Sequence, residues 1–377
     1  MKIVYIDPQS YSNLALYDYS LISNLKSEVT FYGSYLYDQP LSSQMKFVPI
    51  FTYNKKSRWS KGFSYMVSLL KIAMRLINDK PNVVHIQWIK IYRLDYLFLR
   101  WMLHRGINVV YTAHNTLPHN DISRRYFNVF KKYYEQVSHI IVHTDSTRKE
   151  LVESFGILES KISVIPHGLL EDECNNEQVE FFVDVISERC NLNGKIVFSC
   201  LGAQSYYKGF DLIERLWIEN PVFHSNSNIH LLIAGKASSG VSYHDVEKYS
   251  NVSTFNYFLS KEEFEAVIRL SDVILLPYRE ISQSGVLLTV LSRKKAILVS
   301  NAGGLVDPFK CGKVGWIVER SNYENFREVM VSILKDPSDI KKISCDDELW
   351  SNIARMFSWE EIGNSTLNLY SRLSENQ

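Results

Sequence analysis

The sequence predicts an α/β protein with two Rossmann-like, doubly wound domains, each built around its own parallel sheet. Short apolar runs rich in β-branched residues alternate with longer helix-like segments along all 377 residues. Runs as apolar as these indicate strands buried on both faces, as in parallel sheets covered by helices. The chain is long for one hydrophobic core and suits two.

Apolar runs in both halves of the chain are predicted to be strands. The first half contains KIVYI, EVTFY, NVVHIQW, INVVYTAH, HIIVHT and ISVIPHG. The second half contains IVFSCLG, IHLLIAG, VSTFNYF, VILLPY and AILVSN. Each half therefore has enough strands for its own sheet.

The junction between the domains is predicted near residues 168–192, where HGLLEDECNNEQ is polar and acidic. We expect an N-terminal domain at 1–170, a linker at 171–190 and a C-terminal domain at 191–350. The remaining residues, 351–377, include SWEEIGNSTLNLYSRL, an amphipathic segment typical of a helix that starts at a serine cap.

Composition and cysteine usage favour a soluble cytoplasmic protein, because 46% of the residues are hydrophobic and 22% are charged. MKIVYID is typical of a strand rather than a signal peptide, and no apolar run is long enough to span a bilayer. The cysteines are odd in number, scattered and without metal-ligand spacing, which predicts reduced thiols. They are Cys174, Cys190, Cys200, Cys311 and Cys345.

Positive charge is concentrated in the first half of the chain. Residues 1–150 contain 20 Lys and Arg against 10 Asp and Glu, whereas the remainder contains 22 against 31. Residues 39–78 contain no acid but seven bases: Lys46, Lys55, Lys56, Arg58, Lys61, Lys71 and Arg75. With Trp59 and Phe63 available, we expect peripheral contact with an anionic membrane through residues 46–75. The alternative is a solvated loop before an ordinary core-packing helix, and no nucleic-acid partner is expected.

Ligands are expected at the loops that follow the predicted strands, because ligands bind beyond the carboxyl ends of parallel strands. In FSCLGAQSYYKGF, Gly202 ends a strand, and Lys208 and Gly209 open a helix. Backbone N–H groups at a helix start, together with an ammonium group, suit a diphosphate. The alternative is a surface lysine. Gly235 ends the next strand, in IAGKASSG.

A second polar loop, REISQSG, runs directly into the apolar segment VLLTVL. Gly285 is predicted to begin a helix, and small residues before it would let a ligand approach the helix N-terminus. A serine N-cap is the alternative, but it explains one serine and not the whole cluster. The G-x-G-x-x-G fingerprint is absent after every predicted strand, which disfavours an oxidoreductase.

Six segments, taken in order, resemble the motifs of GT-B-fold glycosyltransferases. They are VVYTAHNTLPH, VIPHG, GAQSYYKG, SQSGVLLTV, AILVSNAGGLVDPFKCGKVGWIV and FSWEEIGNSTLNLY. Over nearly its whole length, the chain resembles the retaining glycosyltransferase family 4 (group 1), of a polysaccharide-assembly type. The resemblance implies a GT-B fold with an acceptor-side N-domain, a nucleotide-sugar C-domain and a last helix that crosses back to the N-domain.

Two positions depart from the family pattern at its glutamates. Ser282 and Val290 stand where the family usually has the glutamates that contact the sugar and hold the ribose hydroxyls. Val290 cannot hold a ribose, so either Glu280 reaches the sugar from two residues upstream or Gln283 and Ser284 substitute.

Two further departures concern cations and the first loop. Ala203 replaces the usual arginine, which leaves Lys208 with Arg279 as a second cation. DPQSYSNLALYDY replaces the usual glycine-rich loop, and offers Ser12 and Asn13 instead.

The resemblance implies three groups of site residues. His114 and Glu280 are expected to be catalytic. The expected donor-binding residues are Gly202, Lys208, Gly209, Gly235, Arg279, Ser282, Gln283, Ser284, Gly285 and Val286. The expected acceptor-side residues are Ser12, Asn13, Asn115 and His119. For His114 and His119 the alternative is a structural loop histidine; His85 is interpreted as a core residue and His167 as part of the interdomain turn.

We expect neither a metal nor a cofactor, with the leaving group stabilised by backbone dipoles and Lys208. No D-x-D motif follows a predicted strand, and Asp346 and Asp347 in a late helical stretch are interpreted as solvated. The predicted function is retaining transfer of a sugar from a nucleotide diphosphate sugar to a saccharide acceptor, expected to be lipid-linked, in surface polysaccharide or glycan assembly.

Two alternatives remain. The missing glutamates motivate a non-catalytic GT-B protein that binds a glycan or a partner enzyme. A UDP-sugar epimerase would need added carboxylates for proton abstraction, and the sequence offers no convincing pair.

Overall fold

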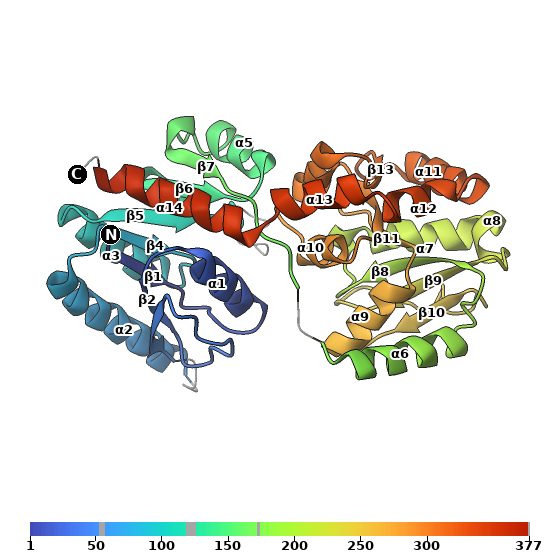
Figure 1. Ribbon diagram of the computed structural model, residues 1–377, viewed down its shortest axis with the longest axis horizontal. Coiled ribbons are helices and arrows are strands. Elements are labelled where there is room, and N and C mark those ends of the chain that lie inside the picture. The colour runs from blue at the N-terminus through green and yellow to red at the C-terminus, as the bar shows by residue number, and fades with distance from the viewer. Residues whose placement is uncertain (53–56, 118–125, 172–173, 376–377) are drawn as a thin grey trace. The chain divides into compact units, whose positions relative to one another are not determined.

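The computed structural model describes residues 1–52, 57–117, 126–171 and 174–375. The chain divides into two compact units (Figure 1). Unit 1 comprises Met1–Gly168 and Phe357–Gln377, and unit 2 comprises Leu169–Met356. Each unit contains one wholly parallel sheet with helices packed against it, so the predicted pair of doubly wound α/β domains is confirmed.

The sheet of unit 1 has seven parallel strands in the order β3-β2-β1-β4-β5-β6-β7. The strands are β1 (Ile3–Ile6), β2 (Val29–Ser34), β3 (Met45–Phe51), β4 (Val83–Ile86), β5 (Asn108–Thr112), β6 (His139–Val142) and β7 (Ile162–Val164). This order places the carboxyl ends of β4, β5, β6 and β7 side by side along one edge of the sheet, where polar loops can meet.

The strands of unit 1 bury both faces because their residues are apolar on each side. Ile3 and Tyr5 of β1 enter one core cluster, whereas Val4 and Ile6 enter the other. The first cluster is covered by α1 (Asn13–Asn24) and α14 (Trp359–Glu375). The second is covered by α2 (Arg58–Asp79), α3 (Tyr92–His104), α4 (Phe127–Gln136) and α5 (Asp145–Glu153).

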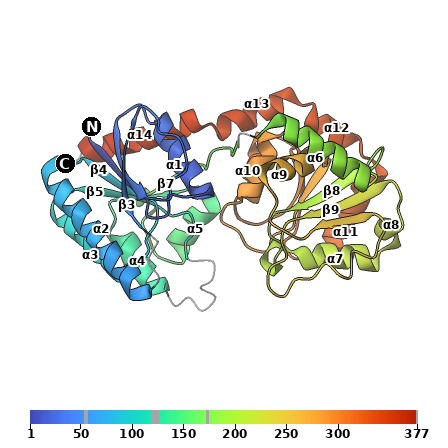
Figure 2. The same cartoon turned by 90° about the horizontal axis from the view of Figure 1, so that it is seen from below.

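The sheet of unit 2 has six parallel strands in the order β10-β9-β8-β11-β12-β13. The strands are β8 (Ile196–Leu201), β9 (Ile229–Ala234), β10 (Val252–Phe255), β11 (Val273–Leu276), β12 (Ala296–Ser300) and β13 (Gly315–Val318). The views agree that α6 (Asn176–Arg189) and α9 (Lys261–Leu270) cover one face (Figures 1 and 2). They place α7 (Phe210–Glu219), α8 (Pro221–His224) and α11 (Tyr323–Lys335) on the other. The remaining helices are α10 (Gly285–Ser292), α12 (Ser338–Ser344) and α13 (Asp347–Met356).

The structure corrects three expectations about elements. Strands β3 and β13 were not among the predicted strands, and both lie at sheet edges, where one side of the strand is less buried. The predicted linker at 171–190 is mostly helix, because α6 occupies Asn176–Arg189 and buries Val179 and Ile186. The segment 351–377 is not one helix, since α13 ends at Met356 and α14 begins at Trp359.

The last helix, α14, completes the fold of unit 1. Ile362, Leu369 and Tyr370 pack into the same cluster as α1 and β1. The helices approach closely at Gly363, where an added Cβ would lie 2.4 Å from the backbone oxygen of Asn24. The chain therefore returns to unit 1 after building unit 2, as the predicted GT-B arrangement requires.

Candidate active site

The loop after β8 brings together three of the expected donor-binding residues of unit 2. Gly202 follows β8, and Lys208 ends the 3-10 turn Tyr206–Lys208. A Cβ added to Gly202 would lie 3.2 Å from Lys208 Nζ and 3.4 Å from Val286 Cγ2. The ammonium group of Lys208 therefore lies beside the strand end and the first turn of α10, as the diphosphate hypothesis requires.

Lys208 is a half-buried cation in an unfavourable environment. Burial lowers the pKa of its ammonium group from 10.5 to about 8, although the nearby Cys200 partly opposes this effect. Its Nζ lies 5.5 Å from the centre of the Tyr278 ring. No ion pair joins Lys208 to a carboxylate within the described parts of the chain. A cation held in this way gains from an anionic ligand.

The first turn of α10 faces the same region. Ser284 is buried and caps the helix, because its hydroxyl accepts a hydrogen bond from Leu287 N at 3.3 Å. Gly285 is exposed, and among the described residues a Cβ there would meet only Leu170 Cδ1, at 3.5 Å. Free N–H groups in a first turn favour negative charge through the helix dipole. The small residues before α10 thus leave its N-terminus open.

Two glycines bring the strand ends of unit 2 close together. A Cβ on Gly209 would lie 2.0 Å from the backbone oxygen of Pro277, and its φ is +74°. A Cβ on Gly235 would lie 2.1 Å from the backbone oxygen of Gly202. Side chains at these positions would push apart the ends of β8, β9 and β11, so both glycines are required for close approach of the backbone.

Arg279 has a partner that the sequence did not predict. Its guanidinium forms a bidentate pair with Asp211 at 2.7 and 2.6 Å and stacks 4.0 Å from the centre of the Tyr206 ring. Its backbone N–H also bonds the Tyr207 oxygen at 2.8 Å. Arg279 therefore braces the turn that carries Lys208, and its direct contact with a donor stays a prediction.

The polar residues before α10 lie where the sequence placed them, after β11. Glu280 is exposed, whereas Ser282 and Gln283 are half-buried. The Ser282 oxygen accepts a hydrogen bond from Gly304 N at 3.2 Å, which holds this loop against the turn after β12. Their contacts with a sugar stay predictions.

In unit 1, His114 lies beyond β5 and is held on several sides. Its Nε2 is 2.8 Å from the Gln87 amide oxygen, and its Nδ1 is 3.1 Å from His143 Nε2. The ring stacks on Trp88, with the centres 4.7 Å apart and the planes 7° apart. Tyr17 contacts it edge-on at 5.1 Å. The ring is thus fixed in one orientation.

The other expected acceptor-side residues are more dispersed. Ser12 is exposed, with φ at 55°, and directly precedes α1, which begins at Asn13. Asn115 is half-buried, and its backbone oxygen lies 3.4 Å from the Tyr134 hydroxyl. His119 lies outside the described residues. His85 is buried, which confirms its interpretation as a core residue. His167 contacts Tyr17 and Trp359 within unit 1.

Sequence reasoning missed a pair of buried carboxyl groups beyond β1. Asp7 directly follows the strand, and Asp18 lies in α1. Gln9 N donates to Asp7 at 2.5 Å, and the Tyr5 hydroxyl donates to Asp18 at 2.8 Å. Burial raises the pKa of Asp7 to about 6. Burial also raises the pKa of Asp18 well above 3.8, and repulsion by the charge of Asp7 adds to this effect. A polar residue directly after a predicted strand was the available signal.

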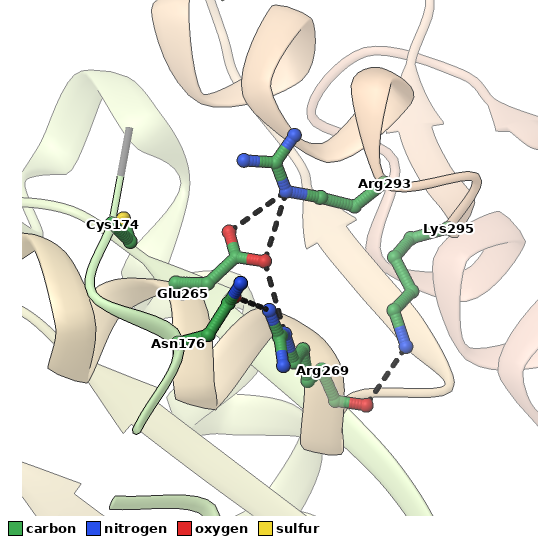
Figure 3. Close-up of a pocket in the computed structure, with 6 residues that line it drawn as sticks. All are labelled: Cys174, Asn176, Glu265, Arg269, Arg293 and Lys295. Carbon is green, nitrogen blue, oxygen red and sulfur yellow. Dashed lines mark hydrogen bonds and ion pairs between the residues drawn. The ribbon is translucent and has the colours of Figure 1, made fainter. Parts of the chain in front are cut away.

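A further pocket, of about 430 Å³, lies away from this region (Figure 3). Its lining includes Lys295, which directly precedes β12, so it lies at the amino edge of the sheet. In it, the buried Glu265 bridges Arg269 at 3.2 Å and Arg293 at 2.9 Å. This ion-pair network ties α9 to the end of α10, and we interpret it as structural.

The described ranges contain no cluster of three His, Cys, Asp or Glu side chains that could hold a metal ion. In the same ranges, no helix combines the length and the apolar character that a membrane span requires.

Comparison with known proteins identifies both halves of the chain. Residues 24–172 match the family model "Glycosyltransferase Family 4", and residues 185–346 match "Glycosyl transferases group 1". No curated protein sequence matches the chain.

Solved structures with the same fold cover the whole chain. Sucrose-phosphate synthase from Thermosynechococcus elongatus is 14% identical, with a TM-score of 0.71 and 100% of both chains covered. HepE of Anabaena in complex with UDP is 10% identical, with a TM-score of 0.71 and coverage of 99% of this chain and 100% of that chain. HepE with UDP-glucose is 11% identical, with a TM-score of 0.70 and the same coverage. These likenesses confirm the predicted GT-B fold.

Proposed function

Because the chain belongs to glycosyltransferase family 4, group 1, we propose that it transfers a sugar from a nucleotide diphosphate sugar to a saccharide acceptor, with retained configuration. The observation that carries this proposal is the half-buried Lys208 ammonium group beside Gly202 and the first turn of α10. HepE, a structural neighbour, binds UDP and UDP-glucose, which supports a nucleotide-sugar donor.

In the proposed reaction, the bond from the anomeric carbon to the donor phosphate breaks while a bond to the acceptor oxygen forms on the same face. The proton of the acceptor hydroxyl passes to the leaving phosphate oxygen. Lys208 and the first N–H groups of α10 stabilise the negative charge that grows on the diphosphate. Glu280 orients the sugar hydroxyls, in place of the glutamate that the family usually has at Ser282.

The acceptor is proposed to be a lipid-linked saccharide in surface polysaccharide or glycan assembly, and the enzyme to contact the cytoplasmic membrane surface through α2 and α3. Helix α2 buries Tyr65, Leu69, Ile72 and Leu76 in the core, as an ordinary core-packing helix would. It also has a second apolar side. Trp59 is 91% exposed and Phe63 is 65% exposed, and both lie on one stripe with Leu70, Met74 and Ile77.

Exposed basic side chains occur on α2 and on the neighbouring helix α3. Helix α3 packs next to α2 (Figures 1 and 2), and Arg93, Leu97, Arg100 and His104 share its exposed side. Lys61 and Lys71 of α2 are also exposed. The predicted bases Lys55 and Lys56 lie outside the described residues. An exposed apolar stripe on a pair of helices that also carry exposed basic residues suits an anionic bilayer surface.

The membrane proposal predicts that Arg93→Ser with Arg100→Ser weakens binding to anionic vesicles by roughly thirtyfold, because each base near such a surface contributes about 1 kcal/mol. Trp59→Ser with Phe63→Ser should also release the protein, since these rings insert at the interface. Co-sedimentation with anionic and neutral vesicles measures both effects. Leu158→Ser, which removes an exposed apolar residue elsewhere in unit 1, is the matched control.

Binding that ignores lipid charge, or that survives in both variants, would contradict the membrane proposal. If the stripe instead pairs two copies of the chain, Trp59→Ser with Phe63→Ser will change the sedimentation coefficient without vesicles.

The transferase proposal predicts that one nucleoside diphosphate among UDP, GDP and ADP stabilises the protein against heat, and that its sugar conjugate is turned over. Glu280→Ala should lower turnover by roughly 10- to 100-fold with nucleotide affinity nearly kept, because a misplaced sugar reacts slowly. Glu348→Ala, at an exposed position of α13, is the control.

The outcomes separate the three candidate functions. Affinity without turnover would support the non-catalytic binding protein. Conversion of the free UDP-sugar into its epimer would support the epimerase. Normal turnover by Glu280→Ala would leave Gln283 or Ser284 as the residues that replace the family glutamate.

A further inference from the structure

Four neighbouring strands of unit 1 are followed by polar groups that are joined in one continuous hydrogen-bond network. Gln87 follows β4, His114 follows β5, His143 follows β6 and Ile165 follows β7. The Gln87 amide lies 2.8 Å from His114, His114 lies 3.1 Å from His143, and His143 Nδ1 lies 2.9 Å from the Ile165 oxygen. Adjacent parallel strands bring these groups together along the carboxyl edge of the sheet.

From Gln87 the hydrogen-bond network also continues into the core, away from His114. His85 Nε2 lies 3.1 Å from the Gln87 amide and 2.7 Å from the Thr112 hydroxyl. His85 Nδ1 lies 2.5 Å from the Tyr370 hydroxyl, on the returning helix α14. His85, Gln87, Thr112 and Tyr370 are all buried. Helix α14 is thus tied to His114 by hydrogen bonds as well as by packing.

The carbonyl group at one end of the hydrogen-bond network determines which atom donates in each of its hydrogen bonds. The Ile165 carbonyl can only accept, so His143 must carry its proton on Nδ1. Burial lowers the pKa of His143 to about 4, so its Nε2 is unprotonated at neutral pH and accepts from His114 Nδ1. Burial, together with His143, also lowers the pKa of His114 well below 6.5. His114 is therefore neutral, with its proton on Nδ1 and a lone pair on Nε2.

The group that faces His114 Nε2 must then be a donor. The Gln87 amide can supply one, because a half turn of the amide exchanges its oxygen and its nitrogen. In that orientation its oxygen accepts from His85 Nε2, and the Tyr370 hydroxyl donates to His85 Nδ1. Every hydrogen bond then runs from α14 towards the Ile165 oxygen, and each ring stays neutral.

We propose that Gln87 is a positioning residue that, with His143, engages both ring nitrogens of His114, so that His114 serves the site as a fixed neutral ring and not as an acid or base. Trp88 and Tyr17 complete the enclosure by stacking and edge contact. This inference deepens the proposed transferase function, on which its kinetic consequence rests. The tautomers do not depend on that function, because they follow from the hydrogen-bond geometry and the burial of the two rings.

The test is nitrogen NMR of the full chain labelled with ¹⁵N-histidine, with the His114 and His143 signals assigned from His114→Ala and His143→Ala variants. At neutral pH both rings are expected as neutral Nδ1–H tautomers. Gln87→Leu should shift the His114 Nε2 signal towards that of a free lone pair, while Gln136→Leu, at an exposed position of α4, should leave it unchanged. An Nε2–H tautomer or an imidazolium for His114 in the wild type would overturn the proposal.

Kinetics provide the second arm. Gln87→Leu should lower kcat by roughly 10- to 100-fold with KM nearly kept, since a displaced ring misplaces the reacting sugar. A Gln87→Leu variant that loses stability without any shift of the His114 nitrogen signal would reduce Gln87 to a structural residue. If no nucleotide sugar is turned over by the wild type, the transferase proposal fails, while the tautomers still decide this one.

Discussion

Lys208→Ala is expected to weaken the binding of the nucleoside diphosphate by about 1.5–3 kcal/mol, the range for hydrogen bonds to charged groups. The ammonium group lies beside Gly202 and Val286, and no carboxylate among the described residues forms an ion pair with it. A bound diphosphate would therefore supply the negative charge that pairs with it. Isothermal titration calorimetry with the diphosphate and with the bare nucleoside measures the effect. Nucleoside binding should change little.

The same site should be sensitive to pH in a defined direction. Burial lowers the pKa of free Lys208 to about 8, so the charged form that binds the anion is depleted as the pH rises above 8. Diphosphate affinity should therefore fall between pH 7 and pH 9.5 in the wild type but not in Lys208→Arg, which stays charged. Lys335→Ala, at the exposed end of α11, is the control. Equal losses for nucleoside and diphosphate would remove Lys208 from the phosphate site.

Asp7→Asn is expected to stabilise the fold by on the order of 3 kcal/mol at pH 8 and by only about 1 kcal/mol at pH 4.5, because the unfolded carboxyl group ionises from about pH 3.8 upwards. Burial raises the pKa of Asp7 from 3.8 to about 6, and a difference of one between the folded and unfolded pKa corresponds to about 1.4 kcal/mol. A group whose pKa is raised by folding stabilises the fold below the unfolded value and loses this contribution as the pH rises through the folded value. Above pH 6, folding must therefore bury a charge.

Urea unfolding at pH 4.5, 6 and 8 measures the effect on stability. The asparagine keeps the oxygen that accepts from Gln9 N, so the loop after β1 should be preserved. Asp79→Asn, at the exposed end of α2, should leave stability unchanged at every pH. A gain of the same size at pH 4.5 and pH 8 would show that burial of the Asp7 charge is not its cause.

The central strands were predictable because their apolar runs are a local property of the sequence. Strands β1 and β8 pair on both sides and are buried on both faces, so nearly every residue in them is apolar. Strand β3 was missed because an edge strand need not be apolar throughout, and it contains the exposed Lys46 together with Pro49. Strand β13, with four residues and Ile317 exposed, was missed for the same reason.

The candidate site was predictable as a set of loops but not as a set of contacts. Gly202, Lys208 and Gly285 could be placed at strand ends and helix starts by turn chemistry alone. The pairing of Arg279 with Asp211 could not, because the two lie 68 residues apart and neither side chain indicates the other. The raised pKa values of Asp7 and Asp18 could not be predicted either, because they depend on how deeply folding buries the two carboxyl groups.

Fold class, family and the positions of the ligand-facing loops could be inferred from the chain alone, because strand periodicity, glycine turns and motif order are local features of a sequence. Contacts in space were needed to establish that Lys208 faces Gly202 and Val286, that α2 carries a second apolar side, and that His114 is held from both nitrogens. These are properties of neighbours distant in sequence. Folding joins residues such as His85 and Tyr370, 285 positions apart, and their environment follows from that contact.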